Sequence, residues 1–542
     1  MTTVENQETA QCRVVSYGPD QAALDEHRQR TLAHPAIQEC LGQARHRLLA
    51  YQLVGDDAKG SEDPPPPSRY RATFYDYTNN MTVMAEGALD DADDIEVTEH
   101  GTQPLPSAEE FAAAVELVAA DPRLGPAIAD GSLHPYRPMP PLLEAEEADG
   151  GQVERTVNVG LLPGEGSLLA HEIVGVNMVT EGVVRFEGQA PAGSVALTTS
   201  CGPPSAGQPT ASRGTAGQYL VTVTQGGVEL WRFLAVRPAA SSGTNGSGVE
   251  LIGVFYRGTK VLDRAHVPIL NVRYDNDVCG PYRDWQWQES QIPVSGTDVA
   301  PGFRRSETPV QTILESGQDG GNFLGVALYT QGQETVLVSE MEAGWYRYIS
   351  EWRLHNDGTI RPRFGFSAVR NSCVCVTHHH HVYWRFDFDI RTAGNNRVRE
   401  FNNPLLPGIS GWRTLIFETR RVRNAARQRR WSVEHTSTGE GYVLTPGPDD
   451  GVADSFGVGD VWALQYRGTP EFDDGQGFTT NPTLAMAQLD RFVNLGARID
   501  NNDVVLWYAA HFTHDVSGSH AGDSGHRVGP DLRPINWPGL AS

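Results

Sequence analysis

The chain has 542 residues, including 57 glycines and 35 prolines, and 39% of its residues are hydrophobic. This composition is typical of a turn-rich, mainly β globular protein and argues against a helical bundle or a disordered chain. The formal net charge of −24 argues against a nucleic-acid or anionic-membrane partner and is compatible with a soluble enzyme.

The N-terminal sequence, MTTVENQETAQ, has neither the basic start nor the apolar core of a signal peptide. No apolar run approaches the ~20 residues that a membrane-spanning helix needs. Six cysteines are too sparse to predict a disulfide framework in a chain of this length. Together these features predict a cytoplasmic protein without a membrane partner.

Residues 1–65 are predicted to be a helical segment followed by a linker. The stretch HPAIQECLGQARHRLLAYQL (34–53) has apolar residues at helical spacing. The stretch DDAKGSEDPPPPS (56–68) combines four prolines with several charges, so we interpret it as a linker that builds no core.

Residues 66–150 are predicted to form a small α+β domain. RYRATFYDYTNNMTVMAEGAL (69–89) indicates two strands around an Asn-Asn turn. A helix follows in SAEEFAAAVELVAADP, where Ser107 and Glu110 have the spacing of a capping box. The acidic, glycine-containing stretch EAEEADGGQ then marks a break in the chain.

Residues 151–542 are predicted to form one large domain. Short alternating stretches such as TVNVGLL, QYLVTVT and DVWALQY recur through this region. Many short strands separated by turn residues are the pattern of an antiparallel β-sandwich. The predicted fold class is therefore mainly β, with a large antiparallel β-sandwich domain preceded by a small α+β domain.

Four consecutive histidines interrupt the sequence CVCVTHHHHVYWRFDFDI (373–390). Because alternate side chains of a strand share a face, His378 and His380 point one way and His379 and His381 the other. Histidine is the commonest metal ligand. A pair on one face therefore predicts two ligands of a metal site, and a third ligand must come from elsewhere in the chain.

The face that carries the metal is open at this point. Cys373 and Cys375 share strand parity with His379 and His381, which allows a mixed cysteine and histidine site. Three imidazoles with open positions suit Cu(II), and zinc is the main competitor. The remaining alternative is a polar strand that binds no metal.

Several segments of the C-terminal 300 residues resemble landmarks of the copper amine oxidase catalytic domain, in that family's order. They are PYRDWQ (281–286), EWRLHNDGTI (351–360), RRWSVEHTSTGEGYVLTP (429–446), DVWALQY (460–466) and DVVLWYAAHFTH (503–514). The His-x-His pair is followed, five residues after its second histidine, by Arg-x-Asp-x-Asp, as in the family. The resemblance implies a copper ion bound by His378, His380 and His514, and it likens residues 66–150 to one of the family's N-terminal domains.

The resemblance also implies a peripheral cation site. Its carboxylates are Asp387, Asp389 and Asp503, and the backbone carbonyls of Phe388 and Val504 contribute as well. Such a set of hard oxygen ligands favours calcium or a similar ion. The alternative is a group of solvated acids at strand ends.

The cofactor motif departs from the family's pattern. Copper amine oxidases convert a tyrosine in Asn-Tyr-Asp/Glu-Tyr to topaquinone, and the equivalent stretch here is Trp-Tyr-Arg-Tyr, with Tyr346 as the precursor. Trp345 would restrict movement of the ring, and Arg347 would favour a phenolate or a quinone oxyanion. Tyr346 is therefore either a quinone precursor or an unmodified tyrosine beside copper.

The general base is less well marked. Asp298 lies near the place where the family has the aspartate that removes the substrate proton, and the alternative is a loop aspartate that caps a turn. Asp284 matches a structural position of the family. His511, His520 and His526 are additional imidazoles that either transfer protons or lie exposed.

The function implied by the resemblance is that of a copper-dependent oxidoreductase. It would oxidise an amine-bearing small molecule with O2, giving an aldehyde, ammonia and H2O2 if topaquinone forms, and it would be a homodimer because the family's sandwiches pair. One alternative is a quinone-free copper oxidase or oxygenase with unmodified Tyr346. Another is a non-catalytic relative, against which an intact set of three histidines argues. The sequence does not predict the substrate.

Overall fold

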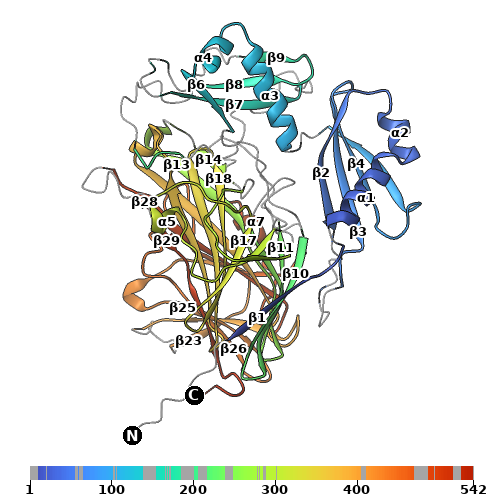
Figure 1. The fold of residues 1–542 in the computed structure, drawn as a ribbon. Coiled ribbons are helices and arrows are strands. Elements are labelled where there is room, and N and C mark those ends of the chain that lie inside the picture. The colour runs from blue at the N-terminus through green and yellow to red at the C-terminus, as the bar shows by residue number, and fades with distance from the viewer. Residues whose placement is uncertain are drawn as a thin grey trace.

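The computed structural model describes residues 10–137, 154–184, 201–205, 217–237, 248–468, 486–516 and 526–540, with short internal gaps at positions 20, 55–58, 60–64, 102–103, 105, 165–166, 168, 170–171, 278, 280, 285–288, 301, 404–410 and 494. Within these residues, two small α+β units precede a large sandwich of two sheets (Figure 1). No helix of the described chain is long and apolar enough to cross a membrane.

The first small unit packs two helices against a four-stranded antiparallel sheet. Its elements are α1 (Gln21–Leu32), α2 (Pro35–Leu41), β2 (His46–Val54), β3 (Arg69–Asp76), β4 (Met81–Ala88) and β5 (Ile95–His100). The strand pair predicted over 69–89 is confirmed as β3 and β4, and Asn80 takes the left-handed backbone conformation that the turn requires.

The predicted division at residue 65 falls inside this unit. β2 pairs with β3 along its length, from His46 opposite Asp76 to Val54 opposite Arg69. The helix predicted over 34–53 ends at Leu41, and the residues after it form β2. Pairing with β3 outweighs the helical spacing of these apolar residues, because local periodicity is a weaker determinant than tertiary packing.

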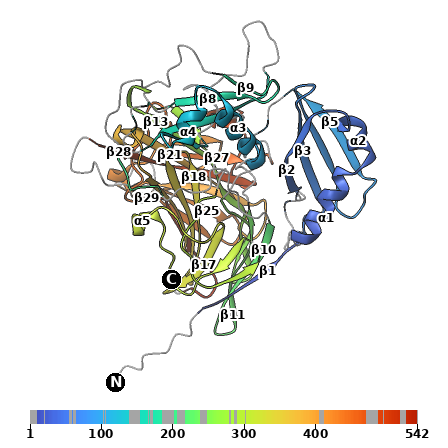
Figure 2. The same cartoon turned by 45° about the horizontal axis from the view of Figure 1, so that its top comes forward.

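The second small unit lies beside the first (Figures 1 and 2). Its elements fall on both sides of the domain boundary that the sequence predicted between residues 150 and 151. Its elements are α3 (Ala108–Ala120), α4 (Gly125–Ala129), β6 (Leu133–Tyr136), β7 (Thr156–Pro163), β8 (Glu172–Asn177) and β9 (Gly182–Val184). Ser107 caps α3 by accepting a hydrogen bond from the Glu110 backbone, while the Glu110 carboxylate pairs with the buried Arg155. The strands β7, β8 and β9, which the sequence assigned to the large domain beginning at residue 151, therefore belong to this small unit.

The first sheet of the sandwich contains ten strands in the order β1-β10-β11-β12-β13-β21-β28-β27-β24, with β14 on β13. The strands are β1 (Gln11–Ser16), β10 (Gly217–Gln225), β11 (Val228–Arg237), β12 (Glu250–Tyr256), β13 (Thr259–Tyr274), β14 (Pro281–Asp284), β21 (His378–Phe388), β24 (Thr419–Arg421), β27 (Val461–Gln465) and β28 (Val504–His514).

The second sheet contains twelve strands in the order β15-β16-β17-β18-β19-β20-β30-β26-β25-β22-β23, with β29 on β20. The strands are β15 (Thr297–Ala300), β16 (Phe303–Arg305), β17 (Val326–Gln331), β18 (Glu334–Ala343), β19 (Tyr346–His355), β20 (Ile360–Ala368), β22 (Asn396–Phe401), β23 (Trp412–Leu415), β25 (Arg430–His435), β26 (Gly441–Thr445), β29 (His526–Val528) and β30 (Asp531–Ile535). The short helices of the sandwich are α5 (Ile313–Ser316), α7 (Asp490–Val493), η2 (Asp275–Asp277), η3 (Cys373–Cys375) and η4 (Ala425–Arg427).

Aromatic side chains from both sheets fill the space between them. Trp352 of β19 packs edge-to-face on Phe386 of β21, and Phe364 of β20 packs likewise on Trp384. These contacts join the central strands of the two sheets, so the even-numbered side chains of β21 point into the sandwich. The face that carries His378 and His380 is therefore an interior face.

Two disulfides fasten the turn η3, which comes just before β21. Cys375 is bonded to Cys201 and Cys373 to Cys279, while Cys12 is a free cysteine of the sandwich. The expectation of no disulfide framework was wrong for this turn. A count of cysteines against chain length misses it, because the partners of Cys373 and Cys375 lie 94 and 174 positions away in the sequence.

Candidate metal centre

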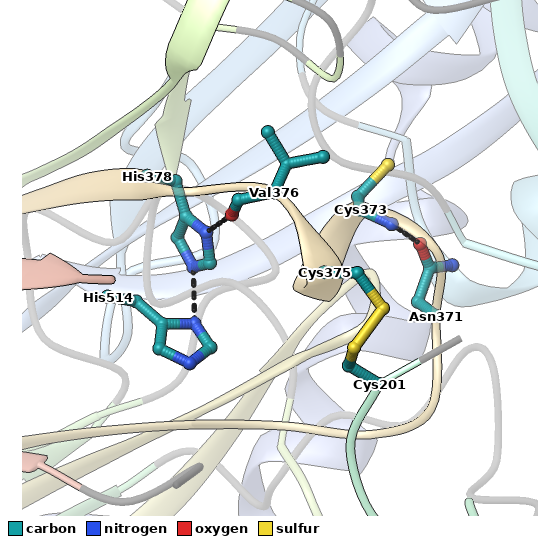
Figure 3. The surroundings of a disulfide bond; sticks show 7 residues. All are labelled: Cys201, Asn371, Cys373, Cys375, Val376, His378 and His514. Carbon is teal, nitrogen blue, oxygen red and sulfur yellow. Dashed lines mark hydrogen bonds between the residues drawn. A yellow bond between two sulfur atoms is a disulfide. The ribbon is translucent and has the colours of Figure 1, made fainter. Parts of the chain in front are cut away.

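The three predicted copper ligands lie near one end of the β21–β28 pair, although their ring nitrogens do not all come within 4.8 Å of one another. The antiparallel register places His378 directly opposite His514, and the His380 ring lies 5.0 Å from that of His378. The Nδ1 atom of His514 lies 3.3 Å from the Nε2 atom of His378. Neighbouring ligand atoms around one ion at about 2 Å are spaced by roughly 3 Å. The arrangement therefore suits two imidazoles that share an ion (Figure 3).

The protein fixes which nitrogen of His378 is available. Its Nδ1 atom lies 2.5 Å from the carbonyl oxygen of Val376 and donates its proton there. The Nε2 atom then faces His514, as Figure 3 shows, and it also contacts the phenolic oxygen of Tyr346. A backbone carbonyl that holds the tautomer in this way is the usual second partner of a metal-binding histidine.

His380 is the predicted ligand whose two ring nitrogens are both left without a hydrogen-bond partner in the described protein. Its ring is fully buried, and neither ring nitrogen has a hydrogen-bond partner among the described residues. A buried polar group without a partner is costly unless something else satisfies it. Burial also holds the pKa of His380 well below its usual range and lowers the pKa of His378 to about 3. Both imidazoles are thus neutral, which is the form that binds a metal.

Tyr346 begins β19 on the opposite sheet and lies against the same histidines. Its phenolic oxygen contacts Nε2 of His378, and its ring lies 4.5 Å from that of His380. Tyr348, two residues further along the same face, stacks on Tyr346 at 5.3 Å with an angle of 11° between the planes. The centre therefore combines three imidazoles with one phenol in a site shielded from solvent.

The other face of β21 holds its histidines with protein partners. His379 lies 3.0 Å from the Thr513 hydroxyl, and the Nδ1 atoms of His381 and His511 are 2.8 Å apart. Cys373 and Cys375 belong to a short helical turn rather than to the strand, and both sulfurs are used in disulfides. Figure 3 shows the one between Cys375 and Cys201. A mixed cysteine and histidine site on this face is therefore excluded.

Two solved structures match nearly the whole chain. A copper-containing benzylamine oxidase from Hansenula polymorpha matches with a TM-score of 0.61 at 13% identity, over 94% of this chain and 96% of that one. A lysyl oxidase from Pichia pastoris matches with a TM-score of 0.55 at 12% identity, over 97% and 92%. The chain has the fold of the copper amine oxidases. No protein-family model and no curated protein matches the sequence.

The copper amine oxidase fold confirms the predicted antiparallel β-sandwich with small α+β structure before it. Identities of 12–13% establish the fold alone, so the chemistry of the centre depends on the residues present in this chain. Those residues are the three histidines and Tyr346, which the structure brings together from β21, β28 and β19.

The two neighbours of Tyr346 have separate partners, and the expectation for Arg347 was wrong. Trp345 donates its indole N–H to the Tyr274 hydroxyl at 2.9 Å, and the Tyr274 ring stacks on His378 at 4.7 Å. Arg347 points to the opposite face of β19 and pairs with the buried Asp319 at 2.8 Å. The expected effect of the guanidinium on the Tyr346 ring is therefore not found, because adjacent strand residues face opposite ways.

Asp298 is not brought to the centre. It lies on β15, and three strands separate it from β19 in the sheet order. Its side chain is 61% exposed and accepts a hydrogen bond from Arg304 at 2.6 Å. Asp284, which ends β14, has its backbone paired with Leu270 of β13.

The three additional histidines have separate positions. His511 lies beside His381 on the outer face, 3.2 Å from a carboxylate oxygen of Asp460. His526 stacks on Phe512 at 4.1 Å, and Phe512 in turn stacks on His380 at 6.1 Å. His520 lies outside the described residues.

At the other end of the β21–β28 pair lies an acidic triad, Asp387, Asp389 and Asp503. Their carboxylate oxygens come within 4.8 Å of one another, and Phe388 and Val504 face each other across the same strand ends. The structure therefore assembles every predicted residue of the peripheral site.

A lysine lies within this acidic triad. The Nζ atom of Lys59 is 2.6 Å from Asp387 and 3.2 Å from Asp389, and it also donates to Asp503. Sequence reasoning missed Lys59 because it belongs to the stretch interpreted as a linker. It likewise missed Tyr274, for which the sequence carries no signal, and Tyr348, whose i+2 spacing from Tyr346 could have indicated a shared face.

A cavity of about 780 Å³ opens elsewhere in the described part of the sandwich, with Tyr329, Arg353 and Arg527 among its walls. Arg353 has the same strand parity as Arg347, so it faces away from Tyr346 on β19. None of the histidines of the metal centre lines this cavity.

Proposed function

We propose that this protein is a copper-dependent oxidoreductase that oxidises an amine-bearing small molecule with O2. His380 carries the proposal, since both of its nitrogens are buried without a partner in the described protein while His378, His514 and Tyr346 converge on the same place. The fold is compatible with this activity, because the solved structures that share it include a copper-containing benzylamine oxidase.

The residues of the chain would divide the work. Three neutral imidazoles would hold copper, which supplies one-electron chemistry with O2, and topaquinone formed from Tyr346 would accept the electrons of the amine. Tyr274 and Tyr348 hold the His378 and Tyr346 rings in place by stacking. The proton-accepting group is not assigned to Asp298, because that carboxylate is exposed and paired with Arg304.

Metal analysis of matched histidine variants tests the copper site. We expect His380→Ala to lose most of its copper, because it removes a buried ligand. The control is His379→Ala, which changes the neighbouring histidine of the same strand but on the outer face, where Thr513 is its partner. Copper retained in His380→Ala but lost in His379→Ala would overturn the proposed ligand set.

A quinone-free copper oxidase is the second candidate, favoured by the packing of Tyr346. The ring is buried, stacked on Tyr348, and held with its phenolic oxygen against His378. Incubation with copper and air distinguishes the two candidates. A topaquinone protein becomes coloured and forms an adduct with a hydrazine reagent, whereas an unmodified Tyr346 does neither.

Turnover is measured as H2O2 release from a panel of primary amines. Under the quinone mechanism Tyr346→Phe abolishes this release, and under the quinone-free mechanism it only weakens it. A protein that binds copper with three histidines yet turns over no amine would instead be a non-catalytic relative. We also propose a homodimer, which light scattering of the full chain would test.

A further inference from the structure

Both lysines of this chain lie at the acidic triad. The sequence contains 43 lysines and arginines, and only Lys59 and Lys260 among them are lysines. Lys59 contacts all three carboxylates, and the Nζ atom of Lys260 lies 3.1 Å from Asp389. In a chain that uses arginine almost everywhere else, this coincidence indicates that the triad requires an ammonium group.

The chemistry of the two cations explains the requirement. An ammonium is a compact charge with three donors that can be directed at three separate carboxylates, whereas a guanidinium is a planar fork that matches one carboxylate at a time. Lys59 forms ion pairs with the three acids of the triad from one point. Its Nζ atom also lies 3.9 Å above the Tyr466 ring, which adds a cation–π contact.

The site is buried and already close to charge balance. Lys59 and Lys260 are each 8% exposed, and Asp387 and Asp389 are 1% and 0% exposed. Arg385 pairs with Asp387, and Asp263 pairs with Lys260, so four acids face three cations. Burial by itself would lower the pKa of Lys59, but the three carboxylates outweigh it and raise that pKa, so the ammonium stays charged.

A divalent ion does not fit beside this lysine. Calcium lies 2.3–2.6 Å from its oxygen ligands, so an ion held by all three carboxylates would occupy roughly the place of the Lys59 ammonium. An additional ion would also give the cluster an excess of positive charge. The residues of the implied calcium site are present, but the chain itself supplies the cation.

We propose that the Lys59 ammonium is the resident cation of the acidic triad, and that the triad takes a divalent ion only when this ammonium is removed. The contact also has a structural consequence. Lys59 lies between β2 and β3 of the first small unit, 328 residues before Asp387 in the sequence, so it fastens that unit to the sandwich. The proposal is independent of the oxidase activity.

The first test uses calcium content and melting temperature. We expect the full wild-type chain to carry no calcium after dialysis against EDTA, and to melt at the same temperature in EDTA and in calcium chloride. We expect Lys59→Met to bind one calcium ion per chain, to melt several degrees lower than wild type in EDTA, and to recover this loss in calcium chloride.

Two matched variants distinguish the effect of the position of Lys59 in the triad from the effect of its positive charge. Lys260→Met removes the other lysine, of equal exposure, but leaves Lys59 in the triad, so it should lose stability without binding calcium. Lys59→Arg keeps the charge but not the compact shape, so it should melt below wild type and bind no calcium. A Lys59→Met protein that melts like wild type and binds no calcium would overturn the proposal.

Amine labelling gives a test that needs no variant. Because the chain has only two lysines and both are buried, a lysine-reactive reagent should modify the N-terminal amine of the native protein and leave Lys59 unmodified until urea is added. Rapid labelling of Lys59 in the native protein, or one tightly bound calcium ion per wild-type chain whose removal lowers the melting temperature, would refute the assignment.

Discussion

The two ends of the β21–β28 pair bury polar side chains in different ways. At the His378 end, imidazoles converge, and both His380 nitrogens lack a hydrogen-bond partner in the described protein. At the Asp503 end, the carboxylates are buried as well, but lysine side chains complete the cluster. Burial alone therefore does not mark a binding site. At the Asp503 end the chain supplies cations for the buried carboxylates, whereas at the His378 end its described residues supply no hydrogen-bond partner for the His380 nitrogens.

The two ends are also attached differently to the rest of the protein: disulfides hold the chain just before the His378 end, and ion pairs hold the Asp503 end. The largest loss of stability is expected when the disulfides are reduced. The disulfides of Cys373 and Cys375 close segments of 94 and 174 residues in front of β21. By loop-closure entropy each contributes roughly 4–5 kcal/mol to stability. Urea unfolding with and without reductant should show this loss, together with weaker copper binding, because the turn η3 carries the chain into His378.

Cys12→Ser provides the control for the reduction experiment. Cys12 is a free cysteine on β1 that packs partly buried against the core, so its replacement should cost far less stability than a lost disulfide and leave copper binding unchanged. Equal stability of the reduced and oxidised wild-type protein would contradict the expectation. It would also mean that the His378 end does not depend on its covalent attachment.

The sequence predicted the His378 end better than the Asp503 end, for a physical reason. The alternation of a strand fixes which histidines share a face, and the order of the family's landmarks places His514 and Tyr346. The Lys59 contact joins residues that are 328 positions apart and comes from a stretch whose prolines and charges indicated only a linker. Long-range contacts of this kind, like the disulfides of η3, follow from tertiary packing that no local pattern encodes.

Local sequence patterns also failed to predict the strand β2 of the first small unit and the position of the predicted general base, Asp298. The apolar residues after Leu41 have helical spacing, yet they form β2 because β3 offers a partner strand. Asp298 was chosen by its distance along the chain, and the sheet order places three strands between it and β19. Position along the sequence predicts strand parity well but does not predict which strands become neighbours.

The buried carboxyl group of Glu340 extends the comparison, because it shows how burial changes the pKa of an acid at a place where no metal ion is predicted. Burial raises the pKa of Glu340 from 4.5 to about 7, even though Ser290 and the Ile313 backbone donate hydrogen bonds to it. Because the folded state holds the proton more tightly, the stabilisation is complete below pH 4.5 and is lost as the pH rises to 7. The loss is about 3 kcal/mol.

Glu340→Gln should therefore be more stable than wild type at pH 8, with the difference shrinking towards pH 5. The amide can still accept from Ile313 and can donate to Ser290, so both hydrogen bonds survive. Urea unfolding at the two pH values measures the difference. Glu342→Gln is the control, since Glu342 lies 3.7 Å from Arg347 and its neutralisation should destabilise the protein at both pH values. A Glu340→Gln effect independent of pH would contradict the expectation.

The smallest expected effect addresses the His378 end directly. His380 is surrounded by the rings of Tyr346, Phe366 and Phe512, so phenylalanine at this position would find apolar and aromatic neighbours. It would also remove two buried nitrogens that lack hydrogen-bond partners in the described protein. We therefore expect His380→Phe to stabilise the metal-free protein by about 1–2 kcal/mol, because an unsatisfied buried polar group costs that much. In the presence of copper the order should reverse, since only the wild type gains stability from binding. Urea unfolding in EDTA and in copper measures both. Had the protein satisfied His380 internally, as lysines satisfy the acidic triad, the variant would be the less stable one in EDTA, and the contrast between the two ends of the strand pair would not hold.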